Sequence, residues 1–465
     1  MDAIERIATS VPGLDQVLQG GIPRYALTLV SGAPGSGKTI LVQQVLFGAA
    51  RPEAPAVYAT TLSEPPLKLA RYQRTLTFFQ QDMVGRSIHL LDLGTPLRRG
   101  GLEAAFDALD QAVRQRRPAL LAIDSFKAMG DMAADDRSWR TFIFDLAARL
   151  PIWGVTAFLV GEYEEADLVS RPEFAVADCI LHLYGTEDHR LQRRHLRVMK
   201  LRGSGFLRGE HLLSIGPDGI RVYPRRDLRD YAPVAAPGGR VTSGVPGLDD
   251  LMGGGLFQGS VALYAGPSGS GKTVLALSFA AAQAAAGRPG LYVSFEEPAD
   301  HLREYVARLS LDSGDGGCLH LRHLSPVELD LDMQAVQLLE EVRAGGYTWV
   351  VLDGVGSLRD LPVHARGYQL FLWDLVTALR RLGVATILTL DTGDPFGRAH
   401  LSDQMLSVLA DTVMVLRYLP SDQELARGLM VMKMRGSAHD TRLVRFTIGA
   451  GGVSLGAAVG SEELR

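Results

Sequence analysis

Gly32-Ala-Pro-Gly-Ser-Gly-Lys-Thr39 has a second copy in this chain, Gly266-Pro-Ser-Gly-Ser-Gly-Lys-Thr273. Both match GxxxxGK[ST], in which backbone N–H groups surround a β-phosphate and the next helix adds its N-terminal dipole. The lysine reaches the β- and γ-phosphate oxygens, and the threonine hydroxyl binds Mg²⁺. A single match could be a chance glycine-rich turn, but two at one offset are not. We predict two sites for ATP and Mg²⁺, with Thr39 and Thr273 on the metal. Their residues are Gly32, Ala33, Pro34, Gly35, Ser36, Gly37, Lys38 and Thr39, and Gly266, Pro267, Ser268, Gly269, Ser270, Gly271, Lys272 and Thr273.

The two loops belong to a longer internal repeat. Val11-Pro-Gly-Leu-Asp-Gln-Val-Leu-Gln-Gly-Gly21 and Val245-Pro-Gly-Leu-Asp-Asp-Leu-Met-Gly-Gly-Gly255 share the loops' offset of 234 residues and are identical at seven of eleven positions. Lys200-Leu-Arg-Gly-Ser204 aligns with Lys433-Met-Arg-Gly-Ser437 at an offset of 233. A period this long indicates tandem domains and not a solenoid. We predict domains at 1–224 and 241–465, joined by a Pro-, Gly- and charge-rich linker at 225–240.

Strand and helix patterns alternate within each half. This alternation is typical of a parallel sheet covered by helices on both faces, so the predicted fold class is α/β. The next apolar segment, the basic stretch after it and a final segment are expected to be antiparallel strands at the sheet edge. In the first half the predicted strands are 26–31, 56–61, 119–124 and 155–161, the helices 37–50, 102–115 and 139–150, and the antiparallel strands include 180–183 and 212–222.

Each half also has an apolar strand that ends in aspartate, LLAIDS at 120–125 and VVLDGV at 350–355. Taken alone, such a run is usually a strand followed by a cap. Both runs follow a P-loop by about 80 to 90 residues, where an aspartate at a strand tip can hold the hydration shell of Mg²⁺. We therefore predict Asp124 and Asp353 as metal residues that act through water.

Hydrolysis further requires a group that orients or deprotonates the attacking water. The second half has a strand that ends in the adjacent acids Glu296 and Glu297, whereas the matching stretch of the first half supplies only Glu64. Acids at a strand end can be plain surface charge, and for Glu64 that alternative stays open. Their position beside a P-loop predicts a catalytic role, so the two halves are not chemically equivalent.

Composition bounds the remaining classes. Hydrophobic residues make up 46% and charged residues 22% of the 465, the balance of a globular protein. A net charge of −4 gives no nucleic-acid footprint over the whole chain. A basic stretch at 190–208 is predicted to be a solvated hairpin in its first half. Cys179 and Cys318 lack ligand-like spacing, so we expect buried core thiols in a reducing cytoplasm. The N-terminus has no signal-peptide pattern and no apolar run could span a bilayer, so a cytoplasmic location without membrane contact is expected.

Taken together, these motifs resemble the KaiC family over nearly the whole chain. The resemblance rests on the Val-Pro-Gly-Leu-Asp run, the P-loop, the strand-end acid, the aspartate strand and the closing Lys-x-Arg-Gly-Ser, each found in both halves. It implies two tandem RecA-like P-loop NTPase domains and a two-tiered homohexamer with ATP at the subunit interfaces. It also implies trans-acting cations that reach the neighbour's γ-phosphate. In this sequence these are Lys200, Arg202, Lys433 and Arg435, which would be ordinary surface charge in a monomer.

The sequence departs from the clock members of that family at three places. The glutamate pair is complete only in the second half, so we expect the first domain to hydrolyse slowly or mainly to hold the ring together. Where the clock members autophosphorylate a Ser-Thr pair, this chain has Ser407-Val408, so Ser407 is a single candidate phosphosite or an ordinary polar surface residue. About ten residues follow the last predicted strand at 443–455, without the longer tail that recruits an activator, and a self-sustaining clock is not expected.

Three classes of function fit such a core. The leading hypothesis is an oligomeric ATPase that signals to a protein partner through its nucleotide state or through serine autokinase activity in the second domain. A RecA-type DNA motor is disfavoured by the acidic pI and by the lack of an aromatic and basic channel. A non-catalytic scaffold held together by ATP would bind nucleotide in both halves without hydrolysing it.

Overall fold

The computed structural model describes residues 4–61, 74–164, 167–188, 191–225, 239–311, 313–314, 317–326, 330–360, 365–392, 404–419 and 425–460. The chain divides into two units, residues 1–226 and 227–465, here called domain 1 and domain 2. Residues 226–238 of the predicted linker lie outside the described residues. Arg240, at the end of that linker, already belongs to a strand of domain 2, and the linker bounds stay a prediction.

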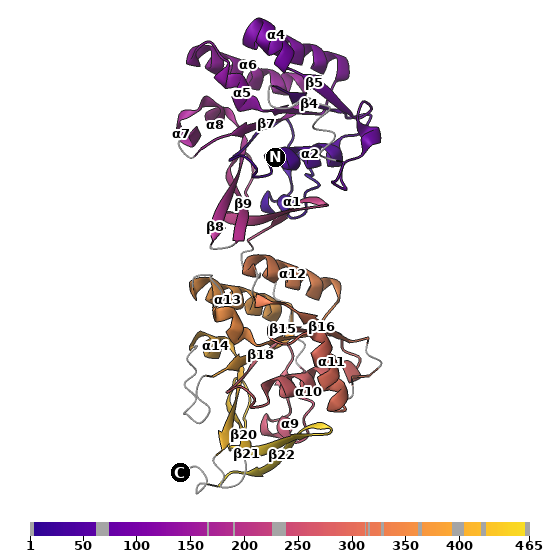
Figure 1. The fold of residues 1–465 in the computed structure, drawn as a ribbon, viewed down its shortest axis with the longest axis vertical. Coiled ribbons are helices and arrows are strands. Elements are labelled where there is room, and N and C mark those ends of the chain that lie inside the picture. The colour runs from indigo at the N-terminus through magenta and orange to yellow at the C-terminus, as the bar shows by residue number, and fades with distance from the viewer. Residues whose placement is uncertain are drawn as a thin grey trace. The chain divides into compact units, whose positions relative to one another are not determined.

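Domain 1 has a central series of strands and helices that follows the predicted order (Figure 1). Its elements are β1 (Arg6–Ile7), α1 (Leu14–Val17), β2 (Ile22–Pro23), β3 (Leu27–Gly32), α2 (Lys38–Ala49), β4 (Ala56–Thr60), β5 (Ile88–Asp92), α4 (Gly94–Arg116), β6 (Leu120–Asp124), α5 (Phe126–Asp131), α6 (Asp136–Trp153), β7 (Thr156–Glu162), α7 (Asp167–Ser170), α8 (Pro172–Val176), β8 (Cys179–Asp188), β9 (Leu191–Leu201), β10 (Glu210–Gly216) and β11 (Gly219–Tyr223).

Domain 2 repeats this plan. Its elements are β12 (Arg240–Val241), α9 (Leu248–Leu251), β13 (Leu256–Phe257), β14 (Val261–Gly266), α10 (Lys272–Ala285), β15 (Gly290–Ser294), α11 (Ala299–Arg308), β16 (Leu319–His323), α12 (Leu331–Ala344), β17 (Trp349–Asp353), α13 (Ala365–Arg381), β18 (Ala385–Asp391), α14 (Gln404–Leu409), β19 (Thr412–Leu419), β20 (Ala426–Met434), β21 (Val444–Gly449) and β22 (Gly452–Ala458).

Within the described residues, each domain is built on one nine-stranded sheet. The order is β11-β10-β9-β8-β3-β7-β6-β4-β5 in domain 1 and β16-β15-β17-β18-β14-β19-β20-β21-β22 in domain 2. The six strands from β8 to β5 are parallel, while β9, β10 and β11 are antiparallel. The predicted α/β class, with a mostly parallel sheet and antiparallel edge strands, is confirmed.

The strand predicted at 180–183 differs from its prediction in direction and place. It belongs to β8, which is parallel to the central strand β3 and lies inside the sheet. The chain returns from β7 through α7 and α8, and a helical crossover brings the next strand back in the same direction. The antiparallel edge therefore begins one strand later, at β9, which forms the predicted hairpin with β8.

Helices cover both faces of the domain 1 sheet (Figure 1). Residues of α2 pack on one face, and those of α4, α5 and α6 pack on the other. Two predicted helices are longer than expected. The helix predicted at 102–115 extends back to Gly94 across a break at Gly100 and Gly101, whose backbone is not helical. The helix predicted at 139–150 begins earlier because Asp135 caps it by accepting the Ser138 N–H at 2.7 Å.

The repeated Val-Pro-Gly-Leu-Asp motif fastens the start of each domain. Gly13 has φ 83°, and a Cβ there would lie 1.9 Å from the carbonyl oxygen of Val222 in β11. The Asp15 carboxylate accepts the Thr9 N–H at 3.0 Å, and the equivalent Asp249 accepts the Ser243 N–H at 2.8 Å. This motif is therefore structural in both domains.

The two cysteines differ. Burial raises the pKa of the Cys179 thiol to about 12, as expected of a core thiol. Cys318 is only partly buried, because it precedes β16 at the edge of its sheet. The expectation of a buried core thiol was therefore wrong for Cys318. Among the described residues, no helix is both long and apolar enough to cross a bilayer.

Candidate functional site

Each P-loop connects the central strand of its sheet to a helix that begins at the P-loop lysine. Gly35 and Gly37 have φ angles of 73° and 100°, and Gly269 and Gly271 have nearly the same values, 74° and 106°. The first N–H groups of a helix have no intrahelical acceptor. Neither of these helices has a side-chain cap, so no capping side chain accepts from these groups. The Oγ atoms of Ser36 and Ser270 are buried without a hydrogen-bond partner in the described chain. These unmatched donors fit the oxygens of a phosphate group.

Both P-loop lysines are buried and turned onto carbonyl groups of their own loops. Lys38 Nζ donates to the Ala33 carbonyl oxygen at 2.8 Å, and Lys272 Nζ donates to that of Pro267 at 2.9 Å. Burial lowers the pKa of Lys38, and the charges of Glu162 and Asp124 oppose this. A desolvated ammonium group of this kind favours an anionic ligand.

The predicted metal residues meet in both domains. Thr39 Oγ1 donates to Asp124 Oδ2 at 2.7 Å, and Thr273 Oγ1 lies 3.4 Å from Asp353 Oδ1. Asp353 is more completely buried, and burial raises its pKa although Thr389, Tyr292 and Thr273 donate to it. A threonine hydroxyl beside a strand-end carboxylate fits a Mg²⁺ ion that one binds directly and the other through water.

The strand-end glutamates of domain 2 point in different directions. The Glu296 carboxylate lies against the backbone of Gly354, directly after Asp353, because a Cβ on Gly354 would be 2.7 Å from Glu296 Cδ. Burial raises the pKa of Glu296, and the charges of Asp391 and Asp353 raise it further. Glu297 turns instead to His301 on α11, at 3.3 Å. Glu64, the single acid predicted for domain 1, lies outside the described residues.

Sequence reasoning missed a carboxylate beside each P-loop lysine. Asp391, at the end of β18, forms an ion pair with Lys272, and the strand register places it beside Gly266. Glu162, at the end of β7, has the same register beside Gly32 in domain 1. An apolar strand that ends in an acid was the available signal, as it was for Asp124 and Asp353. These strands come later in each module than the aspartate strands.

A tyrosine in each domain was also missed. Tyr58 OH donates to Asp124 Oδ2 and Tyr292 OH donates to Asp353 Oδ2, both at 2.8 Å. The two tyrosines are at the offset of the P-loops, so their identity in both halves was a usable signal. In domain 2 alone, Thr389 Oγ1 adds a bond of 2.5 Å to Asp353. The equivalent residue in domain 1 is Val160, which cannot donate.

The Lys-x-Arg pairs lie at the opposite end of the sheet from their own P-loop. Lys200 is paired with Ile180 near the start of β8, whereas Gly32 of the P-loop is beside Leu183 further along that strand. Lys200 Nζ donates to the Ala175 carbonyl oxygen at 3.0 Å, and Arg202 lies 3.3 Å from Asp178. Burial lowers the pKa of Lys200, and the charge of Arg202 lowers it further. This geometry separates each pair from the phosphate site of its own domain.

The same arrangement in domain 2 includes Ser407. Lys433 Nζ donates to the carbonyl oxygens of Ser407 and Ala410 at 2.8 Å each. Arg435 lies 3.6 Å from Asp411. Ser407 is half-buried at the end of the short helix α14, next to these cations.

Comparisons with known proteins agree with this geometry. The family model described as "ATPase: KaiC" matches residues 7–227 and 241–459. A circadian clock oscillator protein KaiC of Picosynechococcus sp. is 28% identical over 468 residues, which cover 97% of this chain and 90% of that protein. The circadian clock protein KaiC3 of Synechocystis sp. is 27% identical over 471 residues, 98% of this chain and 92% of the relative. KaiC of Prochlorococcus marinus is 28% identical over 461 residues, 96% of this chain and 91% of that protein.

Proposed function

The chain belongs to the KaiC family of ATPases, and from this premise we propose that it is a regulatory ring protein that binds ATP in both domains and hydrolyses it chiefly in domain 2. The observation that carries the proposal is the position of Glu296. Its carboxylate lies against Gly354 at the end of the strand that carries Asp353, beside a complete P-loop. A carboxylate at this place can accept a proton from the attacking water.

In this proposal the P-loop residues hold the nucleotide, with Lys38 and Lys272 on the phosphates. Thr39 and Asp124, and Thr273 and Asp353, would hold Mg²⁺, which neutralises phosphate charge when bound. Glu296 orients and deprotonates water. Glu297 pairs with His301 and holds the strand end in place. The Tyr292 and Thr389 hydroxyls fix the Asp353 carboxylate.

The Lys-x-Arg pairs would act on a neighbouring subunit's nucleotide. Their separation from their own P-loop supports this, because a cation can stabilise transition-state charge only where it reaches the phosphate. Lys200, Arg202, Lys433 and Arg435 would then lie at the interfaces of a homohexamer with two tiers. Equivalent helices expose one aromatic ring each, Phe144 at 58% and Trp373 at 39%, which also supports self-association.

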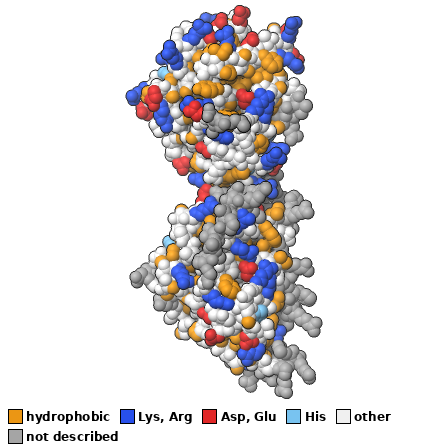
Figure 2. Space-filling model, turned by 180° about the vertical axis from the view of Figure 1, so that it is seen from behind, with side chains coloured by type: hydrophobic (Ala, Val, Ile, Leu, Met, Phe, Trp, Pro, Cys, Tyr) orange, Lys and Arg blue, Asp and Glu red, His pale blue; other side chains and the backbone are white. Residues whose placement is uncertain are grey.

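The output would be signalling to a protein partner of unidentified kind. A DNA-dependent motor has less support. On the face that Figure 2 shows, acidic and basic side chains of domain 1 are interspersed and form no continuous basic track. Single-stranded nucleic acid is bound through such a track, together with stacking aromatic rings.

Two lysine variants test the proposal. We expect Lys272→Ala to lower ATP turnover of the full chain at least about tenfold and Lys38→Ala to lower it less than about twofold. The matched control is Lys127→Ala, which removes a half-buried lysine paired with Asp167 outside both P-loops. Loss of most turnover in Lys38→Ala alone would contradict the assignment to domain 2. Negligible turnover in the unaltered chain, with nucleotide bound, would favour the scaffold.

We also propose that Ser407 accepts a phosphoryl group from the nucleotide of a neighbouring subunit. The support is its place beside Lys433, at the sheet end that would face that nucleotide. The Ser407 hydroxyl would attack the γ-phosphorus, and ADP would leave. Incubation with Mg-ATP followed by mass spectrometry should show one phosphate on Ser407, lost in Ser407→Ala and in Lys272→Ala. An unmodified Ser407 would contradict this step and leave the ATPase proposal intact.

A further inference from the structure

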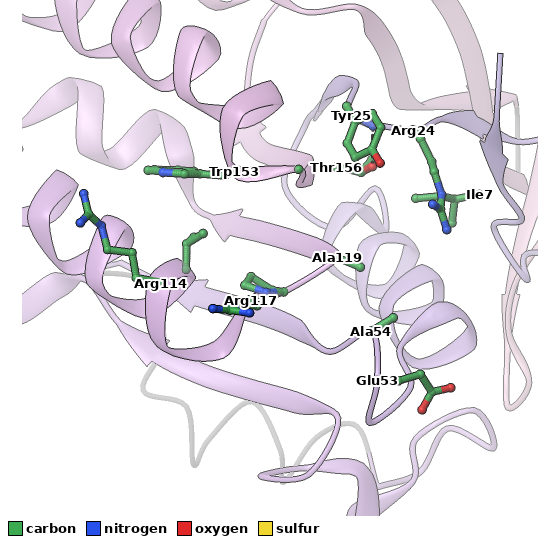
Figure 3. A pocket seen from close by; sticks show the side chains of 13 residues that line it. Ile7, Arg24, Tyr25, Glu53, Ala54, Arg114, Arg117, Ala119, Trp153 and Thr156 are labelled. Carbon is green, nitrogen blue, oxygen red and sulfur yellow. Dashed lines mark hydrogen bonds between the residues drawn. The ribbon is translucent and has the colours of Figure 1, made fainter.

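Domain 1 has a cavity at the end of its sheet opposite the P-loop. It has a volume of about 640 Å³ and lies between the start of β7, the segment before β3 and the end of α4 (Figure 3). Tyr25 and Trp153 supply aromatic rings, and Arg24, Arg114 and Arg117 supply three guanidinium groups. Apolar atoms of Ile7, Val113, Pro118 and Ala119 complete the wall. Its volume is in the range of small-molecule sites.

In domain 2 one side chain bridges the two segments at the equivalent place. Gln258 aligns with Arg24, and its Nε2 donates at 3.0 Å to the carbonyl oxygens of both Thr348 and Gly383. The residues equivalent to these two are Ala119 and Gly154, which line the cavity in domain 1. Arg24 instead forms an ion pair with Glu5, 3.3 Å away. Domain 1 therefore has arginine in place of the glutamine that bridges these two segments in domain 2.

Two of its residues hold a backbone conformation that favours glycine. Tyr25 has φ 63° and Arg117 has φ 44°. Domain 2 has glycine at both aligned positions, Gly259 with φ 75° and Gly346 with φ 60°. Domain 1 keeps large polar side chains where the fold favours glycine, and strain of this kind concentrates at functional sites.

The three arginines differ in whether their guanidinium groups already have an ion-pair partner. Arg24 is paired with Glu5, and Arg114 is paired with Asp110 at 2.6 Å. The Arg117 guanidinium has no ion pair or hydrogen bond among the described residues. The one acid in the lining, Glu53, is exposed at the far side of the cavity from Trp153 (Figure 3). The lining therefore offers one uncommitted guanidinium group, on an exposed side chain, together with two aromatic rings.

We propose that this cavity binds a small anion that carries a planar aromatic ring, such as a nucleoside monophosphate. The Arg117 guanidinium would bind the phosphate or carboxylate with two parallel N–H bonds. Tyr25 and Trp153 would contact the ring. The site is separate from the nucleotide site of domain 1, because the six residues of β3, about 20 Å of strand, lie between Tyr25 and the P-loop.

Isothermal titration of the full chain tests the proposal with three probes: guanosine monophosphate, 3′,5′-cyclic adenosine monophosphate and indole-3-acetate. At least one should bind with a Kd below about 100 µM. Comparing the Kd values of the two phosphate probes with that of the carboxylate probe shows which anion the site binds. The component of binding that belongs to this cavity should survive Lys38→Ala and Lys272→Ala, which alter the P-loops.

Two substitutions copy the residues of domain 2. Arg117→Gly and Tyr25→Gly should each weaken that component at least about tenfold. Neither should lower the melting temperature, because glycine adopts these φ angles freely, so a loss of binding would not reflect unfolding. Arg99→Ala on the same helix removes an equal charge outside the cavity and should leave binding unchanged. Binding of none of the probes up to about 1 mM, or binding that Arg117→Gly leaves intact, would overturn the proposal.

Discussion

Glu296 and Glu297 are neighbours in the sequence, but their carboxylates face different surroundings. The Glu296 carboxylate lies against Gly354 and has a raised pKa, and the Glu297 carboxylate is paired with His301 at 3.3 Å. Both acids lie in the bend that follows β15, which ends at Ser294, and there the Glu296 carboxylate is the one that lies against Gly354. The proposed roles follow from this difference, with Glu296 as the base and Glu297 as a positioning residue.

At this scale we predict a pH effect of Asp391→Asn. A base must be deprotonated, so turnover should fall as the pH drops through the raised pKa of Glu296. The Asp391 charge is one cause of the raised Glu296 pKa, so its removal should lower that pKa. The substitution also removes the ion-pair partner of Lys272, whose positive charge lowers the Glu296 pKa. The acid limb of turnover at saturating ATP should therefore move to lower pH.

Lys38→Ala isolates domain 2 for this pH measurement. Asp250→Asn makes the same charge change at an exposed position of α9 and should leave the limb in place. An unmoved limb in Asp391→Asn would show that Glu296 is not the titrating base.

The strand that carries each Lys-x-Arg pair has a β-bulge just before the lysine. Ile180 pairs with Lys200 but the next residue, Leu181, pairs with Val198, so Met199 has no partner. The same irregularity between Val413 and Met414 leaves out Met432. A bulge changes the direction of the following side chain, so it sets where the lysine points. The bulged methionines are exposed, at 38% and 40%.

At the scale of the element, we predict that these methionines lie in the subunit interface. Met199→Glu and Met432→Glu place an unpaired charge beside the proposed trans cations and should reduce assembly, as measured by light scattering with Mg-ATP. The melting temperature of the subunit should barely change because both side chains are exposed. Met432→Leu, which keeps the apolar surface, is the control. Full assembly of both glutamate variants would place the interface elsewhere.

The molecule as a whole contains two modules of common ancestry that differ in the side chains around their P-loops. Asp353 receives a hydroxyl donor from Thr389, whereas the equivalent residue of domain 1 is Val160, which cannot donate to Asp124. Lys272 is paired with Asp391, whereas the charges of Glu162 and Asp124 act on Lys38 without a direct ion pair among the described residues. The cavity described above belongs to domain 1, where Arg24 replaces the bridging glutamine. These differences support the proposed division of tasks between the domains.

The assembly itself is the prediction at this scale. Native mass spectrometry should show hexamers with Mg-ATP and smaller species with ADP, because the trans cations have their ligand only when a γ-phosphate is present. Lys38→Ala should disrupt the hexamer more than Lys272→Ala does, if domain 1 mainly holds the ring. Monomers with ATP would make the Lys-x-Arg pairs ordinary surface charge.

The sequence by itself determined the duplication, the P-loops, the aspartate strands and the α/β class. These features depend on local patterns: glycine spacing, apolar runs and strand ends each predict the local structure around them. It did not determine that β8 is parallel to β3, that Glu296 and Glu297 face different ways, or that Asp391 meets Lys272. Nor did it show that Arg24 lines a cavity where Gln258 bridges two segments in domain 2. The tertiary structure decided these points, because they depend mainly on contacts between separate segments that meet only when the sheet has formed.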